Sequence, residues 1–317
     1  MKVLITGASG FIGSQLTQQL LAKGLSVIGL YNNQPMRQQH PRLIAVQKNL
    51  SQQGIEAELK QHQPDCLIHA AAINPSVKLD QEQVDFHQFN HQVTMAMVAQ
   101  FLSFAKSHPS KAKKKLINLS TYEIYGHCDD PAGFDMGASL KPMTAYASSK
   151  AKTHQAIEQL ESSAVQFINV VCSNNYGPWQ SSEKLIPAVV QAFINQQPIE
   201  LYGDGSSTRT WTHVHDTCEG LVKIAMHGNQ RKYHLCSDDD ATVEEVVLNI
   251  HRLLLSKNAI QTQQPLIKYH PADFNPIFKI NNQHSTNDLK WQPSIYLDVG
   301  LSTTLDHMLG VKNACKN

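Results

Sequence analysis

Several features that would assign the chain to a special class are missing from its 317 residues. No apolar run reaches the roughly 18 residues that a membrane-spanning helix needs, so we expect no membrane segment and a cytoplasmic protein. No cysteines show the Cys-x-x-Cys spacing, and Cys66 and Cys172 lie in apolar strand-like runs. We therefore expect buried reduced thiols and no structural metal. The length favours one large domain or two closely associated domains.

The chain also lacks an excess of charge of either sign. Its 27 Lys and Arg residues balance 26 Asp and Glu residues, and charged residues make up 17% of the chain against 41% hydrophobic residues. This balance gives no general attraction to nucleic acid or to an anionic membrane, so partners must be inferred from local motifs. Lysines at positions 111 and 113–115 precede a strand-like run, and we interpret them as a solvated loop.

Short β-rich runs alternate with helical periods over the first half of the chain. We expect helices at about residues 11–23, 81–106 and 145–161, and strands at 2–6, 25–30, 43–46, 66–69, 116–119, 165–171 and 232–236. Such alternation predicts an α/β fold with a doubly wound parallel sheet, a Rossmann domain. After Cys172 the segments become shorter and rich in Asn, Gly and Pro. We assign residues 1–172 and 213–238 to the NAD(P)-binding Rossmann domain, and 173–212 and 239–317 to a smaller C-terminal substrate-binding lobe.

A glycine-rich segment joins the first strand to the first helix. Gly7, Gly10 and Gly13 follow a Gly-x-x-Gly-x-x-Gly spacing, and the residues between them include Ser9, Phe11 and Ile12. Glycines allow a tight turn and a close approach of the main chain to a pyrophosphate, while the helix N-terminus offers unpaired N–H groups to the phosphates. This context predicts a dinucleotide-binding site.

The second strand lacks the acidic residue that usually binds the adenosine ribose in dinucleotide folds. Tyr31 and Asn32 stand at its end, and Arg37 follows shortly afterwards. Without the carboxylate a 2′-phosphate is not repelled, and Arg37 is able to pair with it. The cofactor is therefore NAD or NADP, and both alternatives remain open at this point.

Tyr146 and Lys150 are spaced i, i+4 on a predicted helix, so they share one face. Thr121 follows Ser120 at the end of a predicted strand. A lysine charge lowers the pKa of a neighbouring phenol, which lets the pair exchange a proton with a substrate hydroxyl while hydride moves to a nicotinamide. Thr121 would hydrogen-bond the same oxygen.

Together these motifs resemble the extended short-chain dehydrogenase/reductases, in the nucleotide-sugar epimerase/dehydratase group. The glycine-rich loop, His69-Ala70-Ala71-Ala72, Asn90, Ser120-Thr121 and the Tyr146/Lys150 pair occur in the family order. Within this group the chain is most similar to the dTDP-glucose 4,6-dehydratases. That similarity is carried by Asn174-Asn175-Tyr176-Gly177-Pro178, Glu183-Lys184-Leu185-Ile186-Pro187, and Tyr202-Gly203-Asp204-Gly205 with Arg209 and Trp211.

The resemblance implies roles for further residues. It implies cofactor contacts at Ala70 and Ala71, substrate contacts at Asn175 and Lys184, a position beside the nucleotide base for Leu185, and a diphosphate clamp at Arg209. It also implies Glu123 as the base that removes the sugar C5 proton, after oxidation at C4 by Thr121, Tyr146 and Lys150. The expected partner is a nucleoside-diphosphate sugar, and a homodimer formed by the two long helices is expected.

Two departures from the dehydratase pattern keep other activities open. Tyr122 stands where the family has an aspartic acid that protonates the leaving C6 hydroxyl. Near the C-terminus, His270-Pro271-Ala272-Asp273 and Asn275-Pro276 replace a segment that carries a phosphate-binding arginine in the family. The predicted activity is therefore that of either a 4,6-dehydratase or a 4-epimerase. The alternatives are an NADPH-dependent reductase of 4-keto sugar nucleotides and a non-catalytic NAD(P)-binding regulatory protein.

Overall fold

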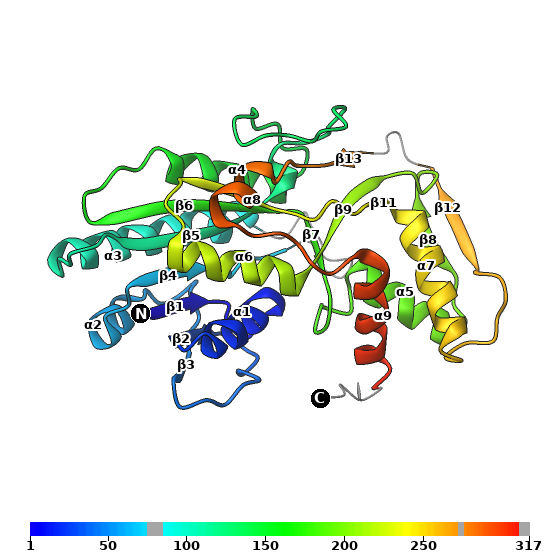
Figure 1. The fold of residues 1–317 in the computed structure, drawn as a ribbon, viewed down its shortest axis with the longest axis horizontal. Helices are drawn as coiled ribbons and strands as arrows, with labels where there is room; N and C mark the ends of the chain where they lie inside the picture. The colour runs from blue at the N-terminus through cyan, green and yellow to red at the C-terminus, as the bar shows by residue number, and fades with distance from the viewer. Residues whose placement is uncertain (75–84, 272–275, 311–317) are drawn as a thin grey trace.

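A seven-stranded sheet flanked by helices forms the larger part of the molecule (Figure 1). The computed structural model describes residues 1–74, 85–271 and 276–310. Every neighbouring pair of strands in the sheet is parallel. Across the sheet the strands are β10 (Lys232–Leu235), β6 (Val165–Cys172), β5 (Lys114–Thr121), β4 (Cys66–His69), β1 (Lys2–Thr6), β2 (Ser26–Tyr31) and β3 (Leu43–Gln47). The order reverses between β1 and β4, which confirms the predicted doubly wound α/β fold.

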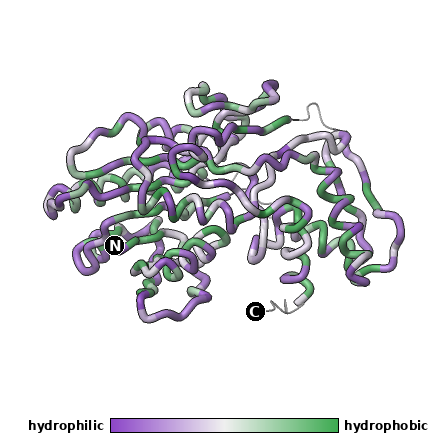
Figure 2. The backbone as a smooth tube through the Cα atoms, viewed as in Figure 1, coloured by the Kyte–Doolittle hydropathy of each residue, from purple (hydrophilic) through white to green (hydrophobic). Residues whose placement is uncertain are grey.

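Helices cover both faces of the sheet. Successive side chains along each strand point to opposite faces, and both faces are hydrophobic. Val3 and Ile5 of β1 pack with α1 (Phe11–Ala22) and α6 (Val214–His227). Leu4, between them in sequence, packs on the opposite face. That face is covered by α2 (Glu56–His62), α3 (Thr94–Ser107) and α4 (Ala145–Glu158). Figure 2 shows hydrophobic and hydrophilic residues alternating along the outer helices, as amphipathic packing requires.

Helix α1 ends at Ala22, one residue before its predicted end. Gly24 has a φ of 82°, a left-handed conformation that favours glycine, and its N–H donates to Leu21 O at 2.9 Å. The second predicted helix differs from the expectation. Residues 81–84 lie outside the described residues, and helical conformation begins at Phe86, with a π-helical segment η1 (Gln88–Val93) before α3. The Thr153 hydroxyl donates to Asn90 O at 2.6 Å, which draws that carbonyl away from the regular helical pattern.

The second lobe is built on short strands and three helices. Its four-stranded sheet has the order β11 (Asp240–Thr242), β9 (Thr208–His213) and β13 (Ile277–Phe278), with β7 (Asn174–Tyr176) also paired to β9. A separate pair joins β8 (Ile199–Tyr202) to β12 (Ile267–His270). Helices α5 (Leu185–Ile194), α7 (Val243–Ser256) and α9 (Leu297–Met308) enclose its hydrophobic cluster, which includes Tyr176 and Trp211. Helix α8 (Gln283–Leu289) returns to the large sheet, where Leu289 joins its core.

Only part of the lysine run forms the solvated loop that the sequence suggested: Lys111 and Lys113 are exposed and precede the strand, whereas Lys114 and Lys115 belong to it. Strand β5 begins at Lys114, whose buried side chain donates from Nζ to Pro64 O at 3.1 Å. The Lys115 ammonium donates to Ile224 O and Ala225 O, two carbonyls near the end of α6. A cation at this place compensates the partial negative charge of a helix C-terminus. Lys115 therefore joins β5 to α6, and Lys114 joins it to the segment before β4.

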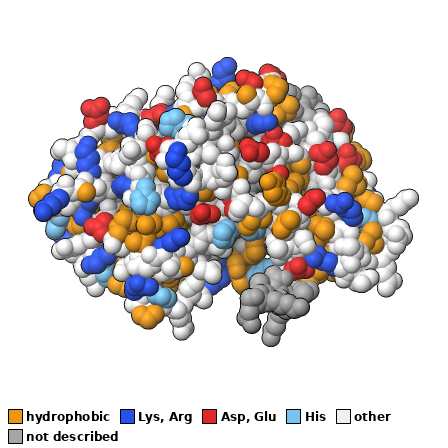
Figure 3. All heavy atoms as spheres, viewed as in Figure 1, with side chains coloured by type: hydrophobic (Ala, Val, Ile, Leu, Met, Phe, Trp, Pro, Cys, Tyr) orange, Lys and Arg blue, Asp and Glu red, His pale blue; other side chains and the backbone are white. Residues whose placement is uncertain are grey.

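The charge distribution on the surface and the state of the cysteines both match the sequence analysis. Figure 3 shows acidic and basic side chains interspersed over the displayed face. Cys66, Cys128, Cys172, Cys218 and Cys236 are free and buried, while Cys315 lies outside the described residues. Burial raises the pKa of the Cys66 and Cys172 thiols to about 12, so neither is a reactive thiolate. Among the described helices, none has the length and apolar character needed to cross a membrane.

Candidate active site

A cavity of about 420 Å³ opens where the carboxyl ends of the parallel strands face the second lobe. Doubly wound folds bind ligands at this edge, beside the reversal of strand order. The large sheet and its connections contribute Phe11, Ile12, Ala70, Ala72, Asn74, Leu119, Ser120, Thr121, Glu123, Tyr146, Lys150 and Cys172. The other side contributes Ser173, Asn174, Asn175, Gln180, Lys184, Leu185, Ile186, Arg209, Trp211 and Val243.

The glycine positions of the glycine-rich turn leave no room for a larger residue. A Cβ on Gly13 would lie 2.0 Å from Gly7 O, and a Cβ on Gly7 would lie 2.9 Å from the main chain of Ala71. Gly7 also has a φ of 68°. Gly10 is the N-cap of α1 and supplies no side-chain hydrogen bond, so the first N–H groups of the helix face the crevice without a side-chain cap. These residues fit the pyrophosphate of a dinucleotide.

A buried hydrogen-bonded chain fixes the neighbouring loop after β4. His69 Nδ1 lies 2.7 Å from Thr6 Oγ1, and its Nε2 lies 2.9 Å from Thr94 Oγ1. Burial lowers the pKa of His69 to about 3, so the ring is neutral. Thr6 Oγ1 also accepts a hydrogen bond from Ala71 N at 3.3 Å. The chain therefore holds Ala71 against the glycine turn, next to Ala70, which lines the cavity.

The cavity is not lined by the predicted cofactor residues at and after the end of β2, namely Tyr31, Asn32 and Arg37. Tyr31 ends the strand, and Asn32 is exposed. Arg37 reaches back over the glycine-rich turn, where its Nη1 donates to Ser9 O and Ser14 Oγ at 3.2 Å each. The sequence predicted a cofactor contact at Arg37 but gave no indication of this placement.

Tyr146 and Lys150 lie together on α4 and both line the cavity. The helix begins after Thr144, whose hydroxyl accepts from Ala147 N at 3.1 Å. The Lys150 ammonium donates to Leu119 O at 2.6 Å, and burial lowers its pKa to about 8. Burial, and secondly the charge of Glu123, raise the pKa of Tyr146 above its ordinary value. Desolvation therefore dominates the pKa of this phenol, and the lowering expected from the Lys150 charge stays a prediction.

Thr121 and Glu123 both line the cavity, whereas Tyr122 between them does not. Thr121 caps the short 3₁₀ helix η2 (Tyr122–Ile124), accepts from Glu123 N at 3.3 Å and lies 3.5 Å from Glu123 Oε1. Burial raises the pKa of Glu123, while the charges of Arg209 and Lys184 oppose that shift. Tyr122 instead packs against Phe278, with ring centroids 5.6 Å apart, and its buried hydroxyl has no partner among the described residues. The expected acid position therefore supplies no side chain to the cavity.

The opposite wall holds all four predicted substrate-binding residues, Asn175, Lys184, Leu185 and Arg209. Arg209 donates from Nη1 to Thr208 O at 3.0 Å and to Pro276 O at 2.9 Å, and its guanidinium carbon lies 4.6 Å from the centre of the Phe278 ring. Asn175 Oδ1 accepts a hydrogen bond from Thr217, and Asn175 O accepts one from Gln180 at 2.8 Å. Ala272, Asp273 and Asn275, where the family arginine is replaced, lie outside the described residues.

Sequence reasoning missed several cavity residues. Asn74, Ser173, Asn174 and Gln180 line the cavity, and Cys172 joins them at the end of β6. Asn174 was visible as part of the Asn-Asn-Tyr-Gly-Pro segment, and Ser173 directly precedes it. Asn74 and Gln180 follow connections whose path depends on tertiary packing, so no local signal marks them.

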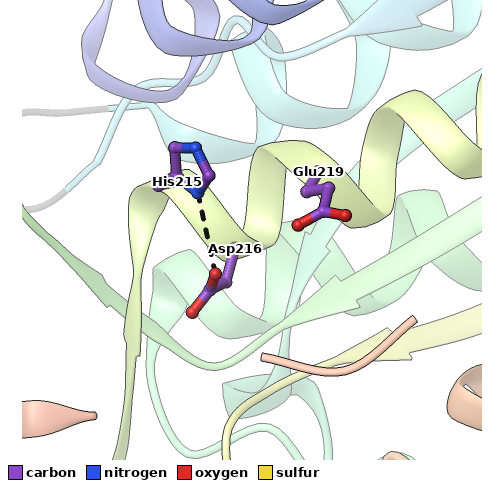
Figure 4. Close-up of side chains that lie close together, drawn as sticks. All are labelled: His215, Asp216 and Glu219. Carbon is purple, nitrogen blue, oxygen red and sulfur yellow. Dashed lines mark ion pairs between the residues drawn. The ribbon is translucent and has the colours of Figure 1, made fainter. Parts of the chain in front are cut away.

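His213 and His215 lie two residues apart in the sequence but do not share a strand. Strand β9 ends at His213 and α6 begins at Val214, so the chain turns between His213 and His215. His215 instead lies near Asp216 and Glu219, with their ligand atoms within 4.8 Å of one another (Figure 4). Asp216 already accepts hydrogen bonds from Ser294 and Ile295. Its carboxylate is therefore used in joining α6 to the segment before α9.

Comparison with known proteins places this site in a family context. The model of the NAD dependent epimerase/dehydratase family matches residues 3–236. The dTDP-glucose 4,6-dehydratase of Xanthomonas campestris pv. campestris is 25% identical, with 96% of this chain and 92% of the relative covered. The crystal structure of the dTDP-glucose 4,6-dehydratase of Bacillus anthracis, in complex with NAD, has a TM-score of 0.82 and 26% identity over 98% of this chain and 97% of that chain. The UDP-glucose 4-epimerase of Thermus thermophilus shares the fold, with a TM-score of 0.84 and 22% identity over 98% and 100% of the two chains.

Proposed function

Because the chain belongs to the NAD dependent epimerase/dehydratase family, we propose that it oxidises C4 of a nucleoside-diphosphate hexose and then eliminates water across C5 and C6. The observation that carries this proposal is the convergence of Thr121, Glu123, Tyr146 and Lys150 on one cavity. The glycine-rich turn would hold NAD or NADP at its pyrophosphate, and the bound nicotinamide would accept and return hydride.

The oxidation step relies on three of these side chains. Tyr146 takes the proton of the C4 hydroxyl, which requires the phenol to ionise first. Its raised pKa opposes that ionisation. The Lys150 ammonium favours the phenolate, and Thr121 hydrogen-bonds the reacting oxygen. Because Lys150 loses its charge as the pH rises through its pKa of about 8, its support of the phenolate is confined to lower pH.

The elimination step relies on Glu123. Among the described residues that line the cavity it is the only carboxyl group. Glu123 takes the C5 proton, and the same carboxyl group then supplies that proton to the departing C6 hydroxyl, which leaves as water. Return of the hydride to C6 and uptake of a solvent proton at C5 would then give the 4-keto-6-deoxy sugar. Because only the ionised carboxylate is a base, and burial raises its pKa, the elimination should gain rate with rising pH at a higher pH than an ordinary carboxylate would require.

A 4-epimerase is the second candidate, and the buried side chain of Tyr122 favours it. The cavity lacks the separate acid of the dehydratase pattern, so oxidation at C4 followed by return of hydride to the opposite face needs only groups already there. The reductase alternative rests on a different observation, because Tyr31 and Asn32 leave the ribose end without a carboxylate and so favour NADPH.

Product analysis in deuterated buffer separates these activities. We would incubate the protein with dTDP-, UDP-, GDP- and CDP-glucose and analyse the products by mass spectrometry. Loss of water together with one deuterium at C5 supports dehydration, and Glu123→Gln should block that exchange while C4 oxidation continues. Unchanged mass with inverted C4 supports epimerisation. If stoichiometric NADPH oxidation by a 4-keto sugar were the sole reaction, the proposal would be replaced by the reductase.

The proposal extends to organisation and location. We assign residues 1–172 and 213–238 to cofactor binding and the remainder to substrate binding, as their contributions to the cavity support. A homodimer through α3 and α4 rests on the family resemblance, and sedimentation would test it by a doubled mass. A cytoplasmic location is supported by the free thiols and by the expected sugar-nucleotide substrate.

A further inference from the structure

Trp179 is an exposed aromatic residue in an unusual conformation. It follows β7 in the loop that precedes α5, it is 54% exposed, and its φ is 70°. A bulky side chain rarely adopts a positive φ, because Cβ then approaches the neighbouring carbonyl. Such strain persists only where surrounding contacts hold it, and it is frequent at ligand-binding sites.

Two ring contacts with described residues hold the Trp179 side chain. On one side it packs edge-on against His307 of α9, with ring centroids 4.3 Å apart. On the other side the Arg37 guanidinium carbon lies 4.6 Å from the ring centre, a cation–π distance. Since Arg37 follows β2 and Trp179 follows β7, this stack is a direct link between the cofactor side and the substrate side of the crevice.

The link places unused hydrogen-bond donors over the phosphate-binding turn. Arg37 uses Nη1 for Ser9 O and Ser14 Oγ, and the described residues give no partner to its Nε and Nη2. A guanidinium has five N–H donors in a fixed fork that matches phosphate oxygens. Because Nη1 contacts Ser9 and Ser14, the guanidinium lies beside the glycine-rich turn and the first turn of α1, where main-chain N–H groups have no side-chain cap.

Arg209 shows the same arrangement on the substrate side. It also uses Nη1 for main-chain oxygens, and it also stacks on an aromatic ring at 4.6 Å. The aromatic ring restricts the guanidinium to one plane in both cases, which lowers the entropy lost when an oxyanion binds. Arg37 therefore has the features of a preorganised phosphate ligand.

From these contacts we infer that Arg37 binds a phosphate of the dinucleotide and that Trp179, on the substrate side, is the positioning residue that holds it there. The inference rests on the proposed cofactor binding. It adds that the dinucleotide is retained by both sides of the crevice, since a residue outside the glycine-rich domain orients one of its phosphate ligands.

Calorimetry with NAD⁺ and NADP⁺ tests the inference on the full chain. Arg37→Ala should weaken dinucleotide binding by about ten- to one-hundred-fold, as expected for loss of a charge-assisted hydrogen bond. Trp179→Ala should weaken it by about three- to tenfold, and Trp179→Phe should restore most of the affinity because a phenyl ring still stacks on the guanidinium. Tyr296→Ala removes another exposed aromatic side chain, 74% exposed, and should change nothing.

The two dinucleotides identify the phosphate. Equal losses for NAD⁺ and NADP⁺ assign Arg37 to the pyrophosphate, whereas a loss confined to NADP⁺ assigns it to the 2′-phosphate; either result supports the inference. Trp179 is also an internal probe, because Trp211 and Trp291 are only 3% and 1% exposed. Dinucleotide should protect the fluorescence of the wild-type protein from acrylamide quenching.

Unchanged affinities in Arg37→Ala and Trp179→Ala would overturn the inference while leaving cofactor binding intact. So would a loss in Trp179→Ala that Trp179→Phe does not recover and that Tyr296→Ala reproduces. A wild-type protein that binds neither dinucleotide would instead refute the proposed function itself.

Discussion

The two sides of the cavity achieve recognition by different means. On the sheet side, Gly7, Gly10 and Gly13 bring the main chain to the ligand, and any side chain there meets backbone atoms. On the lobe side, Arg209 and Lys184 extend long side chains into the same space. A main-chain site tolerates almost no substitution, whereas a side-chain site can be changed one contact at a time. The difference predicts a graded series of mutational effects.

The largest effect is expected at the glycine-rich turn. In Gly13→Ala the new Cβ would meet Gly7 O at 2.0 Å, and a backbone atom cannot rotate away as a side chain would. We expect loss of detectable NAD(P) binding by calorimetry and a destabilisation of about 1–3 kcal/mol, typical of overpacking. Gly137→Ala is a matched control, since its nearest neighbour is a flexible Asp135 side-chain oxygen at 3.3 Å. Full binding in Gly13→Ala would contradict a main-chain site.

The next effect concerns chemistry rather than binding. Tyr146→Phe removes one oxygen from the cavity, so turnover should fall by about 10² to 10⁴ while the dinucleotide still binds. Tyr125→Phe removes a buried hydroxyl that is bonded to His234 at 2.8 Å and lies outside the cavity, and it should affect stability instead. Steady-state kinetics and calorimetry on both variants separate the two roles. A fall of only a few-fold in Tyr146→Phe would require another proton acceptor.

A smaller effect is expected on the lobe side. Arg209→Lys keeps the positive charge but loses the planar fork and the stacking on Phe278, so KM for the sugar nucleotide should rise by about tenfold with little change in kcat. The contrast with Gly13→Ala would show that this wall is built from separable contacts. An unchanged KM would remove Arg209 from the substrate site.

The smallest effect is expected at Tyr122. Its buried hydroxyl has no partner among the described residues, so Tyr122→Phe should stabilise the fold by up to about 1 kcal/mol and leave turnover within a few-fold of the wild type. Thermal unfolding and product formation measure both quantities. A loss of dehydration in this variant would mean that the phenol reaches the substrate after all.

The sequence was informative where one residue type alone satisfies a local constraint. The glycine-rich turn and the i, i+4 spacing of Tyr146 and Lys150 are such cases, and the parallel sheet follows from the alternation of elements. The burial of Tyr122 was not predictable, because it depends on Phe278, which comes much later in the chain. The same holds for the link between Arg37 and Trp179, and for Lys115, whose partners are carbonyls of α6. These contacts arise only once distant segments pack together.

Because the thiols are buried, the rate at which each one is chemically modified can report how often the surrounding structure opens. Burial raises the pKa of Cys66, Cys172, Cys218 and Cys236, which sit within the large sheet or against it. An alkylating reagent must therefore wait for the surrounding segment to open, and the rate of modification at each thiol reports the free energy of that opening. With Cys315 replaced by serine, mass spectrometry of timed samples would rank the strands by how often they separate. Ligands that close the crevice should slow modification at Cys172, which lines it, more than at Cys66.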